Sequence, residues 1–323
     1  MPLREAIAFL KGAVARSSQG DAHYAFHDGV MFAQSSAILA AYPVPHMLGT
    51  FGLAADDLES AVDRMAEEPA IEAGDGTIVL RSGKRRSSID LFAAEPPGHA
   101  LDDVAWLEPS AGMIRGLKTV LPFASKEGKW QRGVELRPGL VRALSSTSAC
   151  LAEVEGLEVD APTAMTDDAV KFITSLPVEP SGWTRLPGAL AFTWPSGAWM
   201  RCQLSAYDWP HKLVDPIFST SPEGDPVEVT DEWREEFSDV KRVGEGTVDL
   251  SPSGMVGRSP HAVHHADFAT GVVHTTRWTL AALAPVLEVA DLWHPDTPHG
   301  KGAVFRGPGV SGVVIAIQGA KRG

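Results

Sequence analysis

The sequence predicts an α+β protein made of three tandem copies of one domain, each running helix, strands, helix, strands. Segments with the apolar spacing of a helix recur about every 110 residues, and each second helix precedes two strand-like runs around a glycine-containing turn. This period is too long for a solenoid repeat and suits a small domain. We therefore expect domains over 1–98, 99–209 and 210–323, with proline-rich linkers over 93–103 and 207–226.

Two helices are expected in each copy. The clearest begins at Thr166, whose hydroxyl can accept a hydrogen bond from the first turn. Asp167 and Asp168 suit the positive end of the helix dipole, and Pro177 ends the helix. In the third copy, Pro285 breaks or kinks the helix, or marks its first turn. The opening helices are expected near 4–15, 110–124 and 230–243, and the second helices near 54–65, 166–176 and 279–293.

A hairpin is expected after each second helix. The turns are predicted near Ser82 and Gly83, at 195–197, and over 309–312. Gly83, Gly197 and Gly312 recur about every 114 residues and are assigned to these turns. Further strands are expected between the two helices of each copy, within 23–44, 132–159 and 246–276.

Composition limits the class of protein. The 323 residues include 44% hydrophobic and 21% charged side chains, which is typical of a globular chain. No apolar run approaches the roughly 18 residues of a membrane span, and charges interrupt the N-terminal segment, so we expect neither membrane insertion nor secretion. Two cysteines, Cys150 and Cys202, suit a reducing cytoplasm. A net charge of −13 means that nucleic acid could contact only a local basic surface.

Several segments resemble the bacterial β-type DNA sliding clamp. The stretch 117–125 (LKTVLPFAS) looks like the opening helix of a clamp's middle domain, and 132–154 resembles the strand pair that follows. The stretch 167–176 resembles that domain's second helix, and 303–317 looks like the terminal hairpin of a clamp. The resemblance implies a head-to-tail homodimer ring of six domains around duplex DNA, which tethers a DNA polymerase and is placed by a clamp loader. It implies neither an enzyme nor a cofactor.

The resemblance also implies two binding surfaces. Weak phosphate contacts inside the ring would allow sliding on DNA. The candidate residues for these contacts are Arg4, Lys11, Arg16, Arg115, Lys118, Lys126, Lys129, Arg132 and Lys171. An apolar pocket between the second and third domains would take a short peptide of partner proteins. Its candidate residues are Ser146, Ser148, Ala149, Cys150, Leu151, Pro210, Leu213, Val214, Val313 and Ile315.

Two other functions remain open from the sequence. One is a metal-dependent enzyme, because His261, His265 and Asp267 would share one face of a strand, with His264 and His274 nearby. The other is a structural assembly protein with a repeated domain. No phosphate-binding loop is present, because the nearest match, 112–119, has the wrong glycine spacing.

Overall fold

The structure is a computed structural model that falls into two compact units, which we describe separately. One comprises Met1–Pro109 and Lys171–Leu204, and the other Ser110–Val170 and Ser205–Gly323. The described residues are 3–15, 22–74, 76–95, 97, 101, 104–125, 133–205, 209, 211–222, 225–259, 261–272, 274–294 and 302–317.

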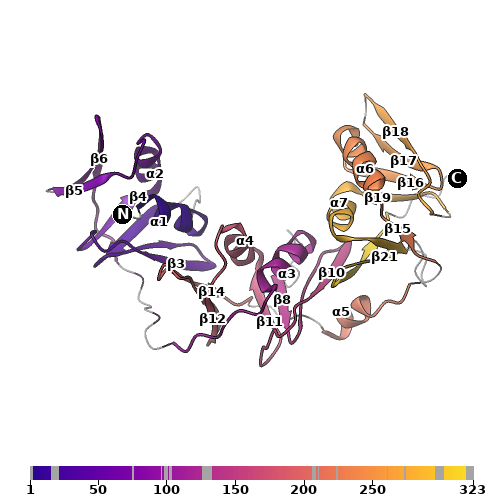
Figure 1. Ribbon diagram of the computed structural model, residues 1–323, viewed down its shortest axis with the longest axis horizontal. Coiled ribbons are helices and arrows are strands. Elements are labelled where there is room, and N and C mark those ends of the chain that lie inside the picture. Colours follow the sequence, from indigo (N-terminus) through magenta and orange to yellow (C-terminus); the bar gives the residue numbers. More distant parts are fainter. Residues whose placement is uncertain are drawn as a thin grey trace. The chain divides into compact units, whose positions relative to one another are not determined.

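The order of elements confirms the predicted repeat (Figure 1). The α-helices are α1 Leu3–Leu10, α2 Ala55–Asp63, α3 Met113–Val120, α4 Asp167–Ser175, α5 His211–Phe218, α6 Asp231–Val243 and α7 Leu280–Val289; the 3-10 helices are η1 Lys11–Ala13 and η2 Leu121–Phe123. The strands are β1 His23–His27, β2 Val30–Gln34, β3 Ile38–Pro43, β4 Thr50–Ala54, β5 Ala70–Gly74, β6 Thr77–Ser82, β7 Arg85–Asp90, β8 Gly133–Arg137, β9 Leu140–Leu144, β10 Ser148–Glu153, β11 Thr163–Thr166, β12 Gly182–Leu186, β13 Ala189–Thr193, β14 Trp199–Gln203, β15 Val227–Glu228, β16 Thr247–Ser251, β17 Gly254–Arg258, β18 Val263–Asp267, β19 Thr276–Thr279, β20 Leu292–His294, β21 Gly302–Gly307 and β22 Val310–Ile315. Helix, strands, helix, strands thus occur three times.

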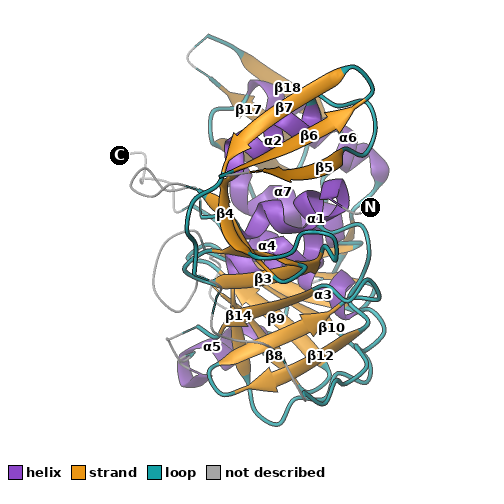
Figure 2. Cartoon of the chain, turned by 90° about the vertical axis from the view of Figure 1, so that its left-hand side faces the viewer, coloured by secondary structure: helices purple, strands orange, loops and turns teal. Residues whose placement is uncertain are grey.

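In the first unit, one sheet joins strands that lie far apart in sequence. Its order is β12-β13-β14-β3-β2-β1-β4, and β3 pairs antiparallel with β14. In Figure 2, β3 and β14 of this sheet are drawn below α1 and α4. The buried face of α1 packs on β3, where the ring of Phe9 meets those of Tyr42, Phe172 and Trp194 at 4.9–5.6 Å. We call the β3·β14 pairing the first seam. A separate sheet has the order β5-β6-β7.

The second unit repeats this arrangement. Its larger sheet has the order β11-β8-β9-β10-β22-β21-β20-β15, with β10 antiparallel to β22 in what we call the second seam. Phe123 stacks on Phe305 at 5.5 Å between ring centroids. A smaller sheet, β18-β17-β16-β19, packs against α6 and α7, where Trp233, Trp278 and Trp293 are almost completely buried. None of the described helices is long and apolar enough to cross a membrane.

One turn recurs in all three copies and sets the start of the third strand. Its first residue is Ser35, Ser145 or Ser259, and we call it the serine turn. In each, the serine N–H donates to the carbonyl oxygen three residues on, at 2.7–2.8 Å. The serine hydroxyl accepts from the N–H groups two and three residues on, at 3.0–3.4 Å. Because these bonds fix the turn, the following strand leaves it in the same register each time.

All six expected helices are present, and the predicted cap at Thr166 is confirmed. The expected helix over 279–293 is shorter than predicted, because α7 ends at Val289 and Leu292–His294 form β20. Thr166 accepts from the N–H of Ala169 at 3.3 Å, and α4 ends before Pro177. Pro285 lies inside α7, which continues through it.

The assignment of Gly312 to a hairpin turn is wrong. The turn of the last hairpin is formed by Pro308 and Gly309, and Gly309 has a φ of 65°. Gly312 instead lies within β22, at a position where a side chain has no room. A Cβ at this position would lie 2.2 Å from the carbonyl oxygen of Ala149 and 2.3 Å from the ring of Phe305.

This crowding makes Gly312→Ala a test of the second seam. We expect a loss of about 2–3 kcal/mol in the free energy of unfolding, because overpacking forces strand and ring apart. Gly74→Ala is the matched control: Gly74 also lies in a strand, but its Cβ would meet ordinary contacts at 3.5 Å or more. Urea unfolding measures both. Equal stability of the two variants would contradict the packing described here.

Candidate functional site

The described basic candidates differ in how their charges are used. The guanidinium of Arg4 donates to the carbonyl oxygens of Val62, at 2.8 Å, and Met65, so it joins α1 to the end of α2. Lys11 Nζ lies 3.2 Å from a carboxylate oxygen of Glu59. Three further candidates have exposed side chains, namely Arg115 and Lys118 on α3 and Lys171 on α4. The candidates Arg16, Lys126, Lys129 and Arg132 lie outside the described residues.

The candidate peptide pocket falls on one face of the second seam. On β10, Ala149 and Leu151 share the face that α5 covers, and Ala149 packs with Leu144, Trp209 and Val214. Val313 of β22 lies directly opposite Ala149 and therefore faces the same way. Together these side chains form an apolar floor, which we call the seam groove.

Exposure separates the predicted pocket residues into a floor, a rim and the core. Val214 is fully buried in the floor, whereas Leu213 is 72% exposed and Ile315 47% exposed at the rim. Cys150 and Ser148 face the opposite side of the sheet from Ala149, and Cys150 is fully buried. The structure therefore assigns Cys150 to the core beneath the groove. Ser146 is exposed in the serine turn, and Pro210 lies outside the described residues.

The linker helix α5 is held on the sheet by buried charge. Arg142 and Glu135 face each other on β9 and β8, each about 2% exposed, and Arg142 Nε donates to the Glu135 carboxylate. Arg142 Nη1 donates to Asp215 of α5 at 2.7 Å. The Arg142 guanidinium also lies 5.2 and 5.0 Å from the ring centroids of Trp209 and Phe218. A single buried cation thus joins two strands to the helix.

Two more side chains complete this network. Arg142 Nη2 lies 3.1 Å from His211 Nδ1, so Nδ1 is the acceptor, because a guanidinium can only donate. His211 Nε2 lies 3.4 Å from the Glu135 carboxylate, and Arg137 lies 3.3 Å from Asp215.

The charges in the network also act on Asp215. Partial burial tends to raise the pKa of its carboxyl, but the hydrogen bond and charge of Arg142, with the charges of Arg137 and His211, outweigh that effect. The pKa of Asp215 therefore lies below its usual value. Its contribution to stability is present above the pKa of the unfolded chain and is lost as pH falls through the folded pKa.

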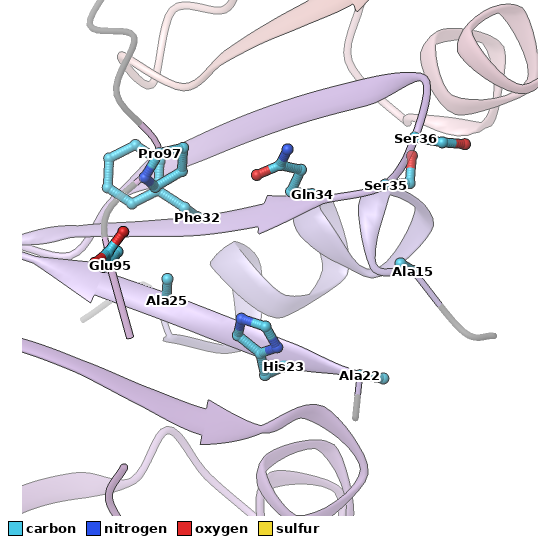
Figure 3. Close-up of a pocket in the computed structure, with 10 residues that line it drawn as sticks. All are labelled: Ala15, Ala22, His23, Ala25, Phe32, Gln34, Ser35, Ser36, Glu95 and Pro97. Carbon is cyan, nitrogen blue, oxygen red and sulfur yellow. The ribbon is translucent and has the colours of Figure 1, made fainter. Parts of the chain in front are cut away.

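The equivalent face in the first unit has a different chemistry. Phe32 and Ala25 pair across β2 and β1, and Phe32 precedes its serine turn by three residues, as Arg142 does. The ion pair of the second copy is thus replaced by an apolar pair. Beside it lies a cavity of about 410 Å³, bordered by the linker residues Glu95 and Pro97 (Figure 3).

The histidine-rich segment forms β18, as its alternating pattern indicates. His265 and Asp267 lie on the exposed face, and Ala266 on the buried face. Within the described residues, no group of three or more histidine, cysteine, aspartate or glutamate side chains is placed to hold a metal ion. The structure gives no support to a metal-dependent enzyme at this segment.

Comparison with solved structures identifies the fold as that of a DNA polymerase sliding clamp. The DNA polymerase III beta subunit of Thermotoga maritima superposes with a TM-score of 0.77 and 16% identity, over 98% of this chain and 97% of that one. The beta chain of Streptococcus pneumoniae gives 0.76 and 12%, over 97% of both chains. The DNA polymerase sliding clamp of Caulobacter crescentus gives 0.74 and 13%, over 98% and 97%. No protein-family model and no curated protein sequence matches the chain.

The buried network generates a prediction on stability. Arg142→Phe removes the guanidinium that faces the buried Glu135 carboxylate, which keeps His211 Nε2 at 3.4 Å, and it is expected to cost about 3–5 kcal/mol. Glu135→Ala/Arg142→Phe copies the apolar pair of the first unit and is expected to recover more than half of that loss, because no unpaired charge stays buried. Urea unfolding of both variants measures the difference. If the double variant is no more stable than the single one, an unpaired Glu135 is not the cause.

Proposed function

We propose that this protein is a sliding clamp, a ring that encircles duplex DNA and tethers a replicative DNA polymerase. The observation that carries the proposal is the match of nearly the whole chain to the clamp fold, at TM-scores up to 0.77. Among the described residues, the strand of histidines forms no group placed to hold a metal ion, so nothing there favours the metal-dependent alternative. We assign the protein a mechanical role, without catalysis or a cofactor, in the cytoplasm.

The seams support assembly as a head-to-tail homodimer. In both, the strand that directly follows a serine turn pairs with the last strand of the next repeat's hairpin. In the described residues, β18 and β7 are the corresponding strands that are left at sheet edges. Pairing β18 of one subunit with β7 of the next, twice, would close a ring of six domains. A heterologous contact that closes gives a ring, whereas one that does not close gives a filament.

A closed ring accounts for how a chain of net charge −13 can work on DNA. Topology holds the duplex, so tight binding is unnecessary, and a few weak phosphate contacts are enough. Arg115 and Lys118, exposed on α3, are our candidates for such contacts, with Lys171 on α4. Arg4 and Lys11 also bond within their own unit, so we give them a mainly structural role.

The seam groove is our candidate site for partner peptides. Its floor of Ala149, Val214 and Val313 is apolar, and its rim residues Leu213 and Ile315 are exposed well beyond what a closed core would leave. An apolar peptide of the DNA polymerase or of the clamp loader would cover this rim.

The ring itself is tested by retention on DNA. Protein placed by its clamp loader is expected to stay on circular duplex DNA and to run off the same DNA after linearisation with unblocked ends. Gel filtration of the DNA complexes before and after cutting measures the retained fraction. Equal retention on circular and linear DNA would replace encirclement by direct binding.

The groove is tested by Leu213→Ala. Because this side chain is mostly exposed, we expect the melting temperature to change by less than about 4 °C. Affinity for the cognate DNA polymerase is expected to fall at least tenfold, or about 1.4 kcal/mol. Leu48→Ala is the matched control, since Leu48 is 74% exposed in the first unit, and it should change neither quantity. Normal affinity of Leu213→Ala would place the partner site elsewhere.

A further inference from the structure

Two segments have no part in the proposed DNA and peptide surfaces. They are the histidine-rich strand β18 and the basic strand β7 with its turn at Gly83 and Lys84. Both are edge strands of their sheets in the described part of the chain. The two seams within the chain allow the register between these edges in neighbouring copies to be worked out residue by residue.

The serine turn gives the register on the side of β18. Ile38 and Ser148 each lie three residues after the turn serine, and they pair with Cys202 and Val314 in the first and second seams. Ala262 holds the same place after Ser259. The partner of Ala262 is therefore the residue of β7 that corresponds to Cys202.

A second repeated hydrogen bond gives the register on the side of β7. The N–H of Leu204 donates at 3.0 Å to a glycine carbonyl at the beginning of its hairpin, and the N–H of Leu91 does the same at 2.8 Å. Both glycines have a positive φ of about 70°. Counting back two residues from each leucine makes Ile89 the counterpart of Cys202. Both of these side chains are buried, as the match requires.

We propose that β18 pairs antiparallel with β7 of another protein molecule, with Ala262 opposite Ile89. This pairing forms a third seam whose outer face is a ladder of mostly polar and charged side chains. The proposal rests on the proposed ring and adds its register and chemistry. On the outer face the register sets His261 opposite Asp90, Val263 opposite Ser88, His265 opposite Arg86, and Asp267 opposite Lys84.

The charges fit this pairing. Asp267 meets Lys84 directly and Arg86 diagonally, so one carboxylate faces two cations. All three side chains are exposed in the single chain. A slip by one residue would turn Asp267 and Lys84 to opposite faces of the sheet and lose the pair. The histidines and the basic turn thus act as two halves of one interface.

The polar ladder distinguishes the third seam from the two within the chain. The outer face of the first seam carries Leu39, Ala41 and Trp199, with one cation, Arg201, opposite Leu39. That of the second carries Ala149, Leu151 and Val313, with Ser311 opposite Leu151. A seam that joins separate copies must also exist open, in water. Exposed apolar edges would then pair with wrong partners, whereas charged edges do so much less.

Cysteine cross-linking of the purified protein tests the register. His264→Cys and Ser87→Cys, placed together in one chain, should lie opposite each other in a non-hydrogen-bonded pair, with Cα atoms about 4.5 Å apart. That spacing is within the range of about 4.4–6.8 Å for disulfides. We expect most of the protein to run as a covalent dimer after mild oxidation.

The control moves one cysteine by a single residue. Val263→Cys with Ser87→Cys puts the sulfurs on opposite faces and should remain mostly uncrosslinked. The natural thiols do not interfere, because burial raises the pKa of Cys150 above its usual range and that of Cys202 to about 12.

Light scattering on the same samples separates failure of the register from failure of the ring. A dimer of twice 34.4 kDa that cross-links only through the first pair supports the proposal. A dimer that cross-links equally through both pairs, or through neither, overturns the register and leaves the ring. A monomer at micromolar concentration overturns both.

A charge exchange tests the ladder independently. Lys84→Asp and Asp267→Lys each set like charges opposite one another, and each should weaken dimerisation about tenfold or more. The double exchange restores opposite charges and should return the dissociation constant to within about threefold of the original. Additive weakening in the double variant would show that these two side chains do not meet.

Discussion

An unpaired strand edge is the constraint on which this structure depends. Each edge of a sheet presents N–H and carbonyl groups that must find partners. Here the third strand of one copy meets the last strand of the next, and the serine turn fixes where that pairing begins. Helices α1, α3 and α5 and the seam groove all lie on sheets that these pairings make continuous. The same geometry gives a physical reason for the proposed ring, since closure would pair the two corresponding edges, β18 and β7.

One backbone plan supports three different surfaces in the three copies. At the place three residues before the serine turn, the first copy has Phe32, the second Arg142 and the third Val256. The first borders an open cavity, the second holds a helix, and the third belongs to the sheet with the polar edge. The backbone hydrogen bonds of the serine turn are therefore the same in the three copies, whereas the side chains on the outer face differ and give each copy a different surface.

Local patterns in the sequence predicted much of the fold. Helices α2, α4 and α6 carry their own start signals, such as Thr166, and hairpin turns carry glycines with positive φ. Long-range contacts were not predictable in this way. The segment that forms helix α5 was expected to be a linker. The sequence near it gives no sign of the helix's contacts, because Arg142 and Glu135, which hold it, are far away in sequence. Gly312 has the spacing of a turn residue, but it lies in a strand, where the nearby ring of Phe305 leaves room only for a glycine.

The candidate site shows the same division. The exposed rim residues Leu213 and Ile315 agree with the pocket that the resemblance implied, although their role is still a proposal. The inward direction of Cys150 follows from strand alternation, but only once the paired face is known. The facing charges Glu135 and Arg142 flank a tight turn, and their alternating positions were the one available signal of a buried pair.

The buried cation of the second copy also has a consequence for how the chain reaches its fold. Three similar sheets in one chain offer a linker helix more than one place to dock, which is a common cause of misassembly in repeat proteins. Asp215 bonds to Arg142 and Arg137 of the second copy, and His211 lies against Arg142 and Glu135. Against Phe32 and Ala25 the same carboxylate would lose its water and gain nothing. The ion pair thus favours docking of α5 on the second copy over docking on the first.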